Sequence, residues 1–110
     1  MMQLLTQELR ATLPPLYGQE GNKNPIVHAK FFCPSSDWTW FVTEGSQKED
    51  DFIFFGYVIG FAEEWGYFSL AELESVGGGL ILPIERDLYF DTGPWSEVIA
   101  RFRKQRGEQA

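Results

Sequence analysis

The chain has 110 residues and a formal net charge of −7, which suits one domain with one hydrophobic core. Its hydrophobic content of 44% is enough to form that core without disulfides, and Cys33, the single cysteine, excludes an intramolecular one. No apolar run approaches the roughly 18 residues that span a bilayer, and no secretory signal pattern opens the chain. We therefore expect a cytoplasmic protein that does not bind membranes.

The charge is unevenly distributed along the chain. Residues 1–100 hold 15 acidic and 5 basic side chains, whereas residues 101–110 hold four basic and one acidic. Nucleic-acid affinity is built largely on Lys and Arg side chains that neutralise phosphates. The acidic body therefore argues against direct nucleic-acid binding. It favours ordinary solubility, a basic partner, or mimicry of nucleic acid.

The N-terminal third predicts a short helix, a loop and a first strand. Thr6 can cap a helix that runs to about Thr12, before a proline pair ends it. Residues 16–25 are rich in Gly, Asn and Pro, which is typical of a loop. Residues 26–33 alternate as a strand does. The expected core face of this strand consists of Val27, Ala29, Phe31 and Cys33.

Three further strands are expected before the next helix. Residues 38–44 predict the second strand, and the polar residues 45–51 predict a hairpin loop. The third strand, 52–61, is apolar on both faces, which is typical of the covered centre of a sheet. Within it, Gly56 suits a bulge or the close approach of another backbone. Residues 65–68 predict a short fourth strand.

A capping box marks the start of the middle helix. Ser69 and Glu72 have the spacing at which hydroxyl and carboxylate satisfy backbone donors reciprocally, and the helix is predicted to run to about Ser75. Gly77-Gly78-Gly79 is expected to end it. These glycines follow a helix and have no adjacent Lys, so they do not match a phosphate-binding loop.

The last part of the chain predicts irregular strand and a final helix. Residues 80–90 suit one irregular strand or two short ones around the charged residues 85–87. Thr92 or Gly93 is expected to cap a helix with Pro94 at its first position. Together the elements predict an α+β fold in one domain, residues 1–110. It has an antiparallel sheet of four to five strands and short N-terminal, middle and C-terminal helices.

His28 and Cys33 are the only residues of their types. They lie five apart on a predicted strand, so their side chains point to opposite faces. Structural zinc needs about four Cys or His ligands. The sequence therefore predicts no metal site, and it indicates no catalytic residue and no cofactor.

Two aromatic pairs are candidate binding residues. A spacing of two places Trp38 with Trp40, and Trp65 with Tyr67, on common strand faces. If their strands pair, the four side chains form one aromatic patch. Core packing is the plainer interpretation of these residues. The alternative is an exposed patch of aromatic anchors rimmed by acids, which suits a protein partner.

Glu85, Arg86 and Asp87 form a third candidate site, because they lie between two apolar segments. The plainer interpretation is an exposed turn with an intramolecular salt bridge. The alternative is a small enzyme or nucleotide-binding protein whose carboxylates act as acid and base or hold Mg²⁺.

Several motifs of the chain are distinctive as a set: Leu13-Pro14-Pro15-Leu16-Tyr17, Lys30-Phe31-Phe32, Trp38-Thr39-Trp40, Phe54-Phe55-Gly56, residues 66–74 and residues 82–90. This set resembles a bacterial family of unknown function, DUF2958, that is often carried on plasmids and other mobile elements. The resemblance covers about residues 4–98 and leaves the basic tail 101–110 outside. It implies no reaction. It implies a context of transferred DNA, in which small acidic proteins sometimes interfere with host defences or assist transfer.

Three function hypotheses follow. The first is a non-enzymatic binding or accessory protein of a mobile element that acts by protein–protein interaction, through the Trp38 and Trp40 face or through residues 85–87. The second is a nucleotide-binding protein or enzyme with its site at Glu85, Arg86 and Asp87. The third is an acidic decoy that occupies the nucleic-acid-binding site of a host defence protein.

Overall fold

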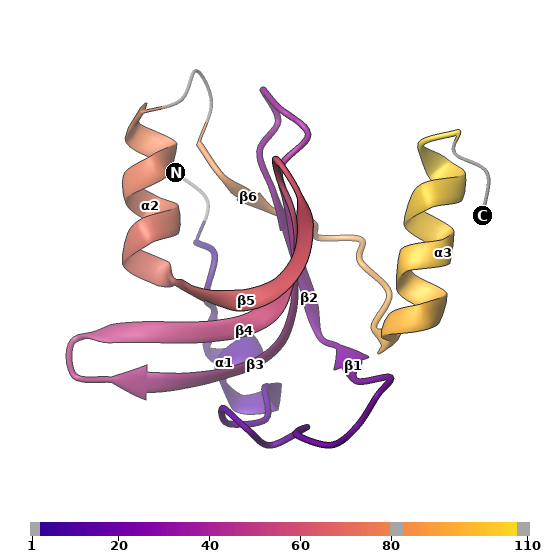
Figure 1. Cartoon of the computed structure of the whole chain (residues 1–110). Coiled ribbons are helices and arrows are strands. Elements are labelled where there is room, and N and C mark those ends of the chain that lie inside the picture. The colour runs from indigo at the N-terminus through magenta and orange to yellow at the C-terminus, as the bar shows by residue number, and fades with distance from the viewer. Residues whose placement is uncertain (1–2, 80–82, 108–110) are drawn as a thin grey trace.

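The structure of the protein is a computed structural model that describes residues 3–79 and 83–107 (Figure 1). This part of the chain forms an α+β domain, as the sequence predicts. No helix within it is long and apolar enough to cross a membrane. The elements are α1 (Gln7–Thr12), β1 (Ile26–Val27), β2 (Ala29–Phe32), β3 (Thr39–Lys48), β4 (Asp51–Ile59), β5 (Glu63–Ser69), α2 (Leu70–Gly79), β6 (Glu85–Arg86), β7 (Gly93–Pro94) and α3 (Trp95–Gln105).

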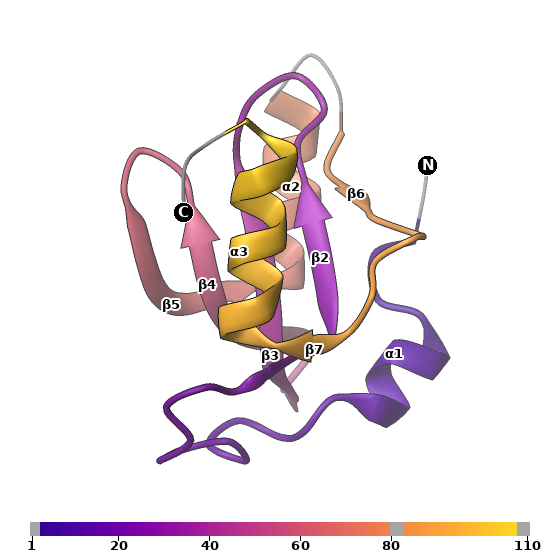
Figure 2. The ribbon, with the colours of Figure 1, turned by 90° about the vertical axis from the view of Figure 1, so that its right-hand side faces the viewer.

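Five strands form one antiparallel sheet in the order β5-β4-β3-β2-β6, and β1 pairs with β7 in a separate two-stranded sheet. Figure 2 shows α3 lying along the face of the large sheet opposite to α2. As its double-sided apolar pattern indicates, β4 lies inside the sheet, between β3 and β5. The sheet therefore carries a core on each face.

The two cores are unequal. The larger one lies under α1 and α2 and includes Leu9 and Leu73 from these helices. The smaller one lies under α3. The larger core also contains Ala29, Phe31, Cys33, Trp40, Val42, Phe52, Phe54, Phe68 and Ile84, while Val27, Phe41, Ile59, Val98 and Ile99 form the smaller one.

Two of the predicted helix caps are present. The Leu9 amide donates to the Thr6 hydroxyl at 3.1 Å, and the Glu72 amide donates to the Ser69 hydroxyl at 3.0 Å. The predicted end of the second helix is wrong, because α2 continues past Ser75 to Gly79. Glycine inside a helix costs about 1 kcal/mol relative to alanine, which weakens but does not forbid helix.

The predicted strand 26–33 is two strands, because the chain changes partners at His28. Before it, β1 pairs with β7, and after it β2 pairs with β3 and β6. Val27 therefore packs in the smaller core rather than beside Ala29 in the larger one. The expected core face is buried at all four positions, but it is not one face.

The predicted hairpin loop 45–51 is mostly strand. β3 runs to Lys48 and β4 begins at Asp51, so only two residues turn the chain. One of them, Glu49, has φ 56°, the left-handed conformation that a tight hairpin turn requires. The main-chain hydrogen bonds of a ladder form regardless of side-chain polarity, which is why polar composition was misleading here.

Gly56 has the close backbone approach that the sequence suggested. A Cβ at this position would lie 1.9 Å from the Phe41 carbonyl oxygen. The neighbouring ladder shifts register between Val42 and Glu44, which leaves Thr43 as a bulge. Just beyond this bulge, β3 contacts the segment that precedes the 16–25 loop, because the Gly45 amide donates to the Pro14 carbonyl at 2.9 Å.

In the described part of the segment 80–90, which was predicted to be irregular strand, the strand is β6, followed by a turn at residues 87–90. Residues 80–82 lie outside the described residues. The final helix starts one residue later than expected, with Pro94 as its N-cap. Its first amides are satisfied by the 16–25 loop instead of by Thr92 or Gly93, because Trp95 N donates to Pro25 O at 2.8 Å.

Candidate functional site

The register places the two candidate aromatic pairs on opposite faces of the sheet. Trp40 is paired with Val58, which is paired with Glu64 on β5. Trp65, the residue after Glu64, is paired with Tyr57, the residue before Val58. Because paired residues share a face, Trp65 points to the side opposite Trp40. The four aromatic residues therefore do not form one patch.

Trp38 and Trp40 belong to the face of the larger core. Trp40 is buried, and the half-buried Trp38 stacks on it at 5.8 Å between ring centroids. The Trp38 ring also lies directly over Gly60 and contacts the exposed Phe61 edge-on at 5.3 Å. Trp40 is therefore part of the core, and Trp38 and Phe61 are the members of this group that reach the surface.

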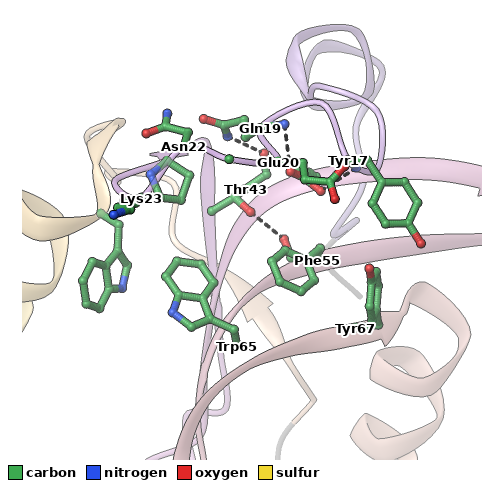
Figure 3. A pocket seen from close by; sticks show the side chains of 13 residues that line it. Tyr17, Gln19, Glu20, Asn22, Lys23, Thr43, Phe55, Trp65 and Tyr67 are labelled. Carbon is green, nitrogen blue, oxygen red and sulfur yellow. Dashed lines mark hydrogen bonds between the residues drawn. The ribbon is translucent and has the colours of Figure 1, made fainter.

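On the other face, an open pocket of about 420 Å³ lies between the 16–25 loop and strands β4 and β5. Figure 3 shows Phe55, Trp65 and Tyr67 along one side of it, with the loop residues across from them. Trp95, from the start of α3, also lines the pocket. The tryptophan and tyrosine of β5 are 36% and 55% exposed, so this aromatic surface is accessible.

The pocket's aromatic rings form a continuous row. Phe55 is stacked on Trp65 at 6.0 Å and 13° between planes, and it contacts Tyr67 at 4.9 Å. Trp65 in turn contacts Trp95 at 5.4 Å. Rings in mutual contact hold one another in place, so they offer a firm surface rather than four mobile side chains.

Glu44 and Gln19 hold the opposite wall. The buried Glu44 carboxylate accepts hydrogen bonds from the amides of Tyr17 and Gln19, at 2.8 and 2.9 Å. The Gln19 side-chain amide donates to the carbonyls of Ile26 and Thr43, both at 2.9 Å, and accepts from the Ile26 amide at 2.7 Å. These contacts join the loop to β1 and β3, so the wall is fixed before any ligand arrives.

Tyr17 closes one end of the pocket. Its φ of 70° lies in the left-handed region, which is uncommon for a residue with a side chain. Figure 3 shows its hydroxyl turned toward that of Tyr67. Hydrogen bonding to Tyr17, desolvation, and the negative charges of Glu44 and Glu20 raise the pKa of Tyr67. The Tyr67 phenol is therefore neutral at physiological pH.

The start of α3 closes the other end. Asn24 accepts a hydrogen bond from the Ser96 amide at 2.8 Å and donates one to the Ser96 hydroxyl at 2.9 Å. The indole N–H of Trp95 is buried without a hydrogen-bond partner among the described residues. A buried donor without an acceptor is costly, so this end of the pocket has unused hydrogen-bonding capacity.

Glu85, Arg86 and Asp87 lie together, half-buried, at the far edge of the sheet. The Asp87 carboxylate forms an intramolecular salt bridge with Lys30 at 3.6 Å. The segment is not the exposed turn of the plainer interpretation, because Glu85 and Arg86 form β6 and all three residues are half-buried. The three residues also border an open hollow of about 290 Å³, together with Lys30, Phe32, Leu88 and Tyr89.

His28 and Cys33 do not combine into a site. Burial lowers the pKa of the half-buried His28, and the buried Cys33 thiol lies 3.3 Å from the Ser35 hydroxyl. Across residues 3–79 and 83–107, no group of three or more His, Cys, Asp or Glu side chains is arranged to hold a metal ion.

Sequence reasoning missed most of the pocket. Of its residues it singled out only Trp65 and Tyr67, because the remainder come from four separate segments. One signal was available: Phe55 belongs to the second apolar face of a strand that was predicted to be central. The other wall was not recognisable, because Glu44 looks like any strand-end carboxylate until its partners in the loop are known.

The fold and the pocket define a small single-domain α+β protein with an aromatic surface site. The chain belongs to the family described as Protein of unknown function (DUF2958), whose sequence model matches residues 3–108. This match confirms the resemblance and extends it through most of the basic C-terminal segment, which the motifs alone had left outside. Neither the curated proteins nor the solved structures include a significant match to the chain.

Proposed function

We propose that the protein is a non-enzymatic binding module that acts by protein–protein interaction, and that its pocket over β4 and β5 receives a segment of the partner. The observation that carries this proposal is the row of aromatic rings left open to solvent opposite a hydrogen-bonded wall. Interfaces between proteins are enriched in Trp, Tyr and Phe at their centres and are polar at their rims.

The geometry of the pocket supports binding rather than incomplete core packing. Exposed aromatic surface is tolerated in single residues, whereas a contiguous group with a polar border is typical of interaction sites. The wall is already ordered by Glu44 and Gln19, so a partner does not have to immobilise it. Preorganisation of this kind lowers the entropic cost of association.

The family resemblance and the sequence support the setting that we propose for this module. The proposal includes an accessory role for a plasmid or other mobile element, because the resembled family is often carried on such elements. It also includes a cytoplasmic location, which the lone Cys33 favours. The acidic decoy stays a hypothesis within this setting, since the chain's net charge of −7 is its only support.

The test is a comparison of two aromatic truncations. Tagged protein is expressed in a bacterial host, a captured partner is identified and purified, and its affinity is measured by titration. Trp65→Ala should weaken this affinity by at least about 10-fold, because central interface tryptophans commonly contribute 2 kcal/mol or more. The matched control is Tyr89→Ala, which removes a 92% exposed ring outside the pocket and should change affinity by less than about 3-fold.

The opposite pattern would overturn the proposal. Affinity that depends on Tyr89 and not on Trp65 would move the site to the hollow beside Glu85, Arg86 and Asp87. The absence of any partner that binds as a purified protein would remove protein–protein interaction as the function.

The hollow beside Glu85, Arg86 and Asp87 supports the second candidate function, a nucleotide-binding protein. The favourable observation is its volume of about 290 Å³ with the Lys30 ammonium at its edge, since lysine is a common phosphate ligand. Saturable binding of ATP that Lys30→Ala abolishes would support this candidate. No saturation at millimolar ATP would exclude it.

A further inference from the structure

The chemistry of the pocket is more specific than its shape. Two of its lining residues are acidic, Glu20 and Glu44, and one is basic, Lys23. Figure 3 shows Lys23 and Tyr17 at opposite ends of the pocket, with Glu20 above the ring of Phe55. Glu44 is the strand partner of Phe55, so both carboxylates line the same pocket as the aromatic row. Among the described residues, no salt bridge joins Lys23 to either of them.

The buried carboxylate retains capacity for a ligand. Each Glu44 oxygen accepts one backbone amide, from Tyr17 or from Gln19. An ionised carboxylate offers about four acceptor positions, so roughly half of them remain. A positively charged donor that reaches this wall would gain hydrogen bonds without breaking those that hold the loop.

We propose that the pocket accepts an arginine side chain of the partner polypeptide, an inference that rests on the function proposed above. The planar guanidinium stacks on Trp65 and Phe55, and its N–H groups point toward the carboxylates of Glu20 and Glu44. Guanidinium combines a flat face for aromatic rings with several donors for carboxylates, whereas the ammonium of lysine is a compact, strongly hydrated charge.

Other flat ligands fit the same surface less well. A nucleotide base can stack on aromatic rings, but its phosphates would face two carboxylates on a chain of net charge −7. A partner's tryptophan or tyrosine would leave the acidic wall without a cation. Charge complementarity therefore selects the cationic planar group.

The experiment uses a short probe in place of the whole partner. The purified full-length protein is titrated with the capped tripeptide acetyl-Gly-Arg-Gly-amide, and the indole N–H signals of Trp65 and Trp95 are followed by NMR. The matched probe contains citrulline, which has the shape of arginine without its charge. Arginine should give saturable shifts in the millimolar range, and citrulline should bind at least about 10-fold more weakly.

Two variants with the same change in charge localise the effect. Glu20→Gln removes a carboxylate from the pocket and should weaken arginine binding by about 3- to 10-fold. Glu64→Gln removes an exposed carboxylate of β5 that does not line the pocket and should change binding by less than about 2-fold.

The outcomes separate this inference from the proposed function. Equal binding of arginine and citrulline overturns the arginine inference, and so does the absence of shifts at 20 mM probe or stronger shifts with AMP. The proposed function survives each of these results if the affinity of the purified partner still depends on Trp65. If that affinity is indifferent to Trp65, the proposed function fails, whatever the probes do.

Discussion

The two faces of the sheet carry similar aromatic residues, which are buried in a core on one face and line an open pocket on the other. β4 contributes Phe54 to one face and Phe55 to the other. The Phe54 ring is fully buried among Phe31, Phe52 and Phe68, beneath the face covered by α1 and α2. The Phe55 ring stays half-exposed, because α3 covers only part of its face. Aromatic content alone therefore does not separate core from site; the extent of helix cover does.

The two faces also differ in how they are held together. The larger core is almost entirely apolar, and its rings contact one another directly. The pocket side depends on directed polar contacts, such as those of Glu44 to the loop and of Glu63 to α3. A change of charge or pH should therefore affect the pocket side while leaving the larger core unaltered.

The sharpest test of this contrast removes one ring from each face. Phe54→Ala creates a cavity in closely packed core and should lower the free energy of unfolding by about 3–5 kcal/mol. Phe55→Ala removes a ring that borders open space and should cost about 1–2 kcal/mol. Urea unfolding followed by circular dichroism measures both. Equal losses would show that the pocket side is packed as firmly as the larger core.

A smaller effect is expected from the polar wall. Glu44→Ala leaves the amides of Tyr17 and Gln19 without their acceptor and should cost about 1–3 kcal/mol. It should also make the 16–25 loop more sensitive to limited proteolysis than in the wild-type protein. The control Glu64→Ala removes an exposed carboxylate and should stay within about 0.5 kcal/mol. An unchanged loop in the Glu44 variant would contradict the assignment of this carboxylate as its anchor.

The smallest effect is a dependence on pH on the α3 side. A hydrogen bond from Tyr57 at 2.9 Å lowers the pKa of Glu63 below its ordinary 4.5, with a further contribution from Arg103 at 2.5 Å, while partial burial opposes the shift. The lowered pKa means that the folded protein releases this proton more readily than the unfolded chain. The stabilisation is therefore present above pH 4.5 and is lost as the pH falls through the lower, folded-state pKa.

Glu63→Gln tests that dependence. The variant should be less stable than the wild-type protein at pH 7 by at most about 0.5 kcal/mol, because the ion pair is exposed and screened by solvent. The difference between the two proteins should shrink toward pH 3, as measured by urea midpoints across the range. A constant difference at all pH values would mean that Glu63 acts through its shape and not through its charge.

The sequence was informative wherever a local rule decides the structure. Thr6 and Ser69 cap helices as predicted, and the apolar residues on both faces of β4 correctly place this strand inside the sheet. Local rules failed where the outcome depends on distant residues. The change of partner at His28 and the opposite faces of Trp40 and Trp65 follow from strand register, which single-strand periodicity does not specify.

The candidate site was predictable only in part, for the same reason. Trp65 and Tyr67 were recognised by their spacing. The single aromatic patch expected with Trp38 and Trp40 requires a strand register that the chain does not adopt. The pocket wall depends on the partners of Glu44, which lie 25 and 27 residues away along the sequence. Hydrogen bonds between residues so far apart in the sequence cannot be recognised from its composition or from the spacing of residue types.

The contact of Asn24 with Ser96 spans 72 positions of sequence and joins the loop of the pocket to the first turn of α3. This contact therefore constrains the length of the 16–25 loop. An insertion or deletion between Gln19 and Asn24 would move the side-chain amide of Asn24 out of reach of Ser96. The first turn of α3 would then be exposed to water. Engineers who wish to graft new recognition loops onto this scaffold should keep that spacing and vary the identities of the residues between.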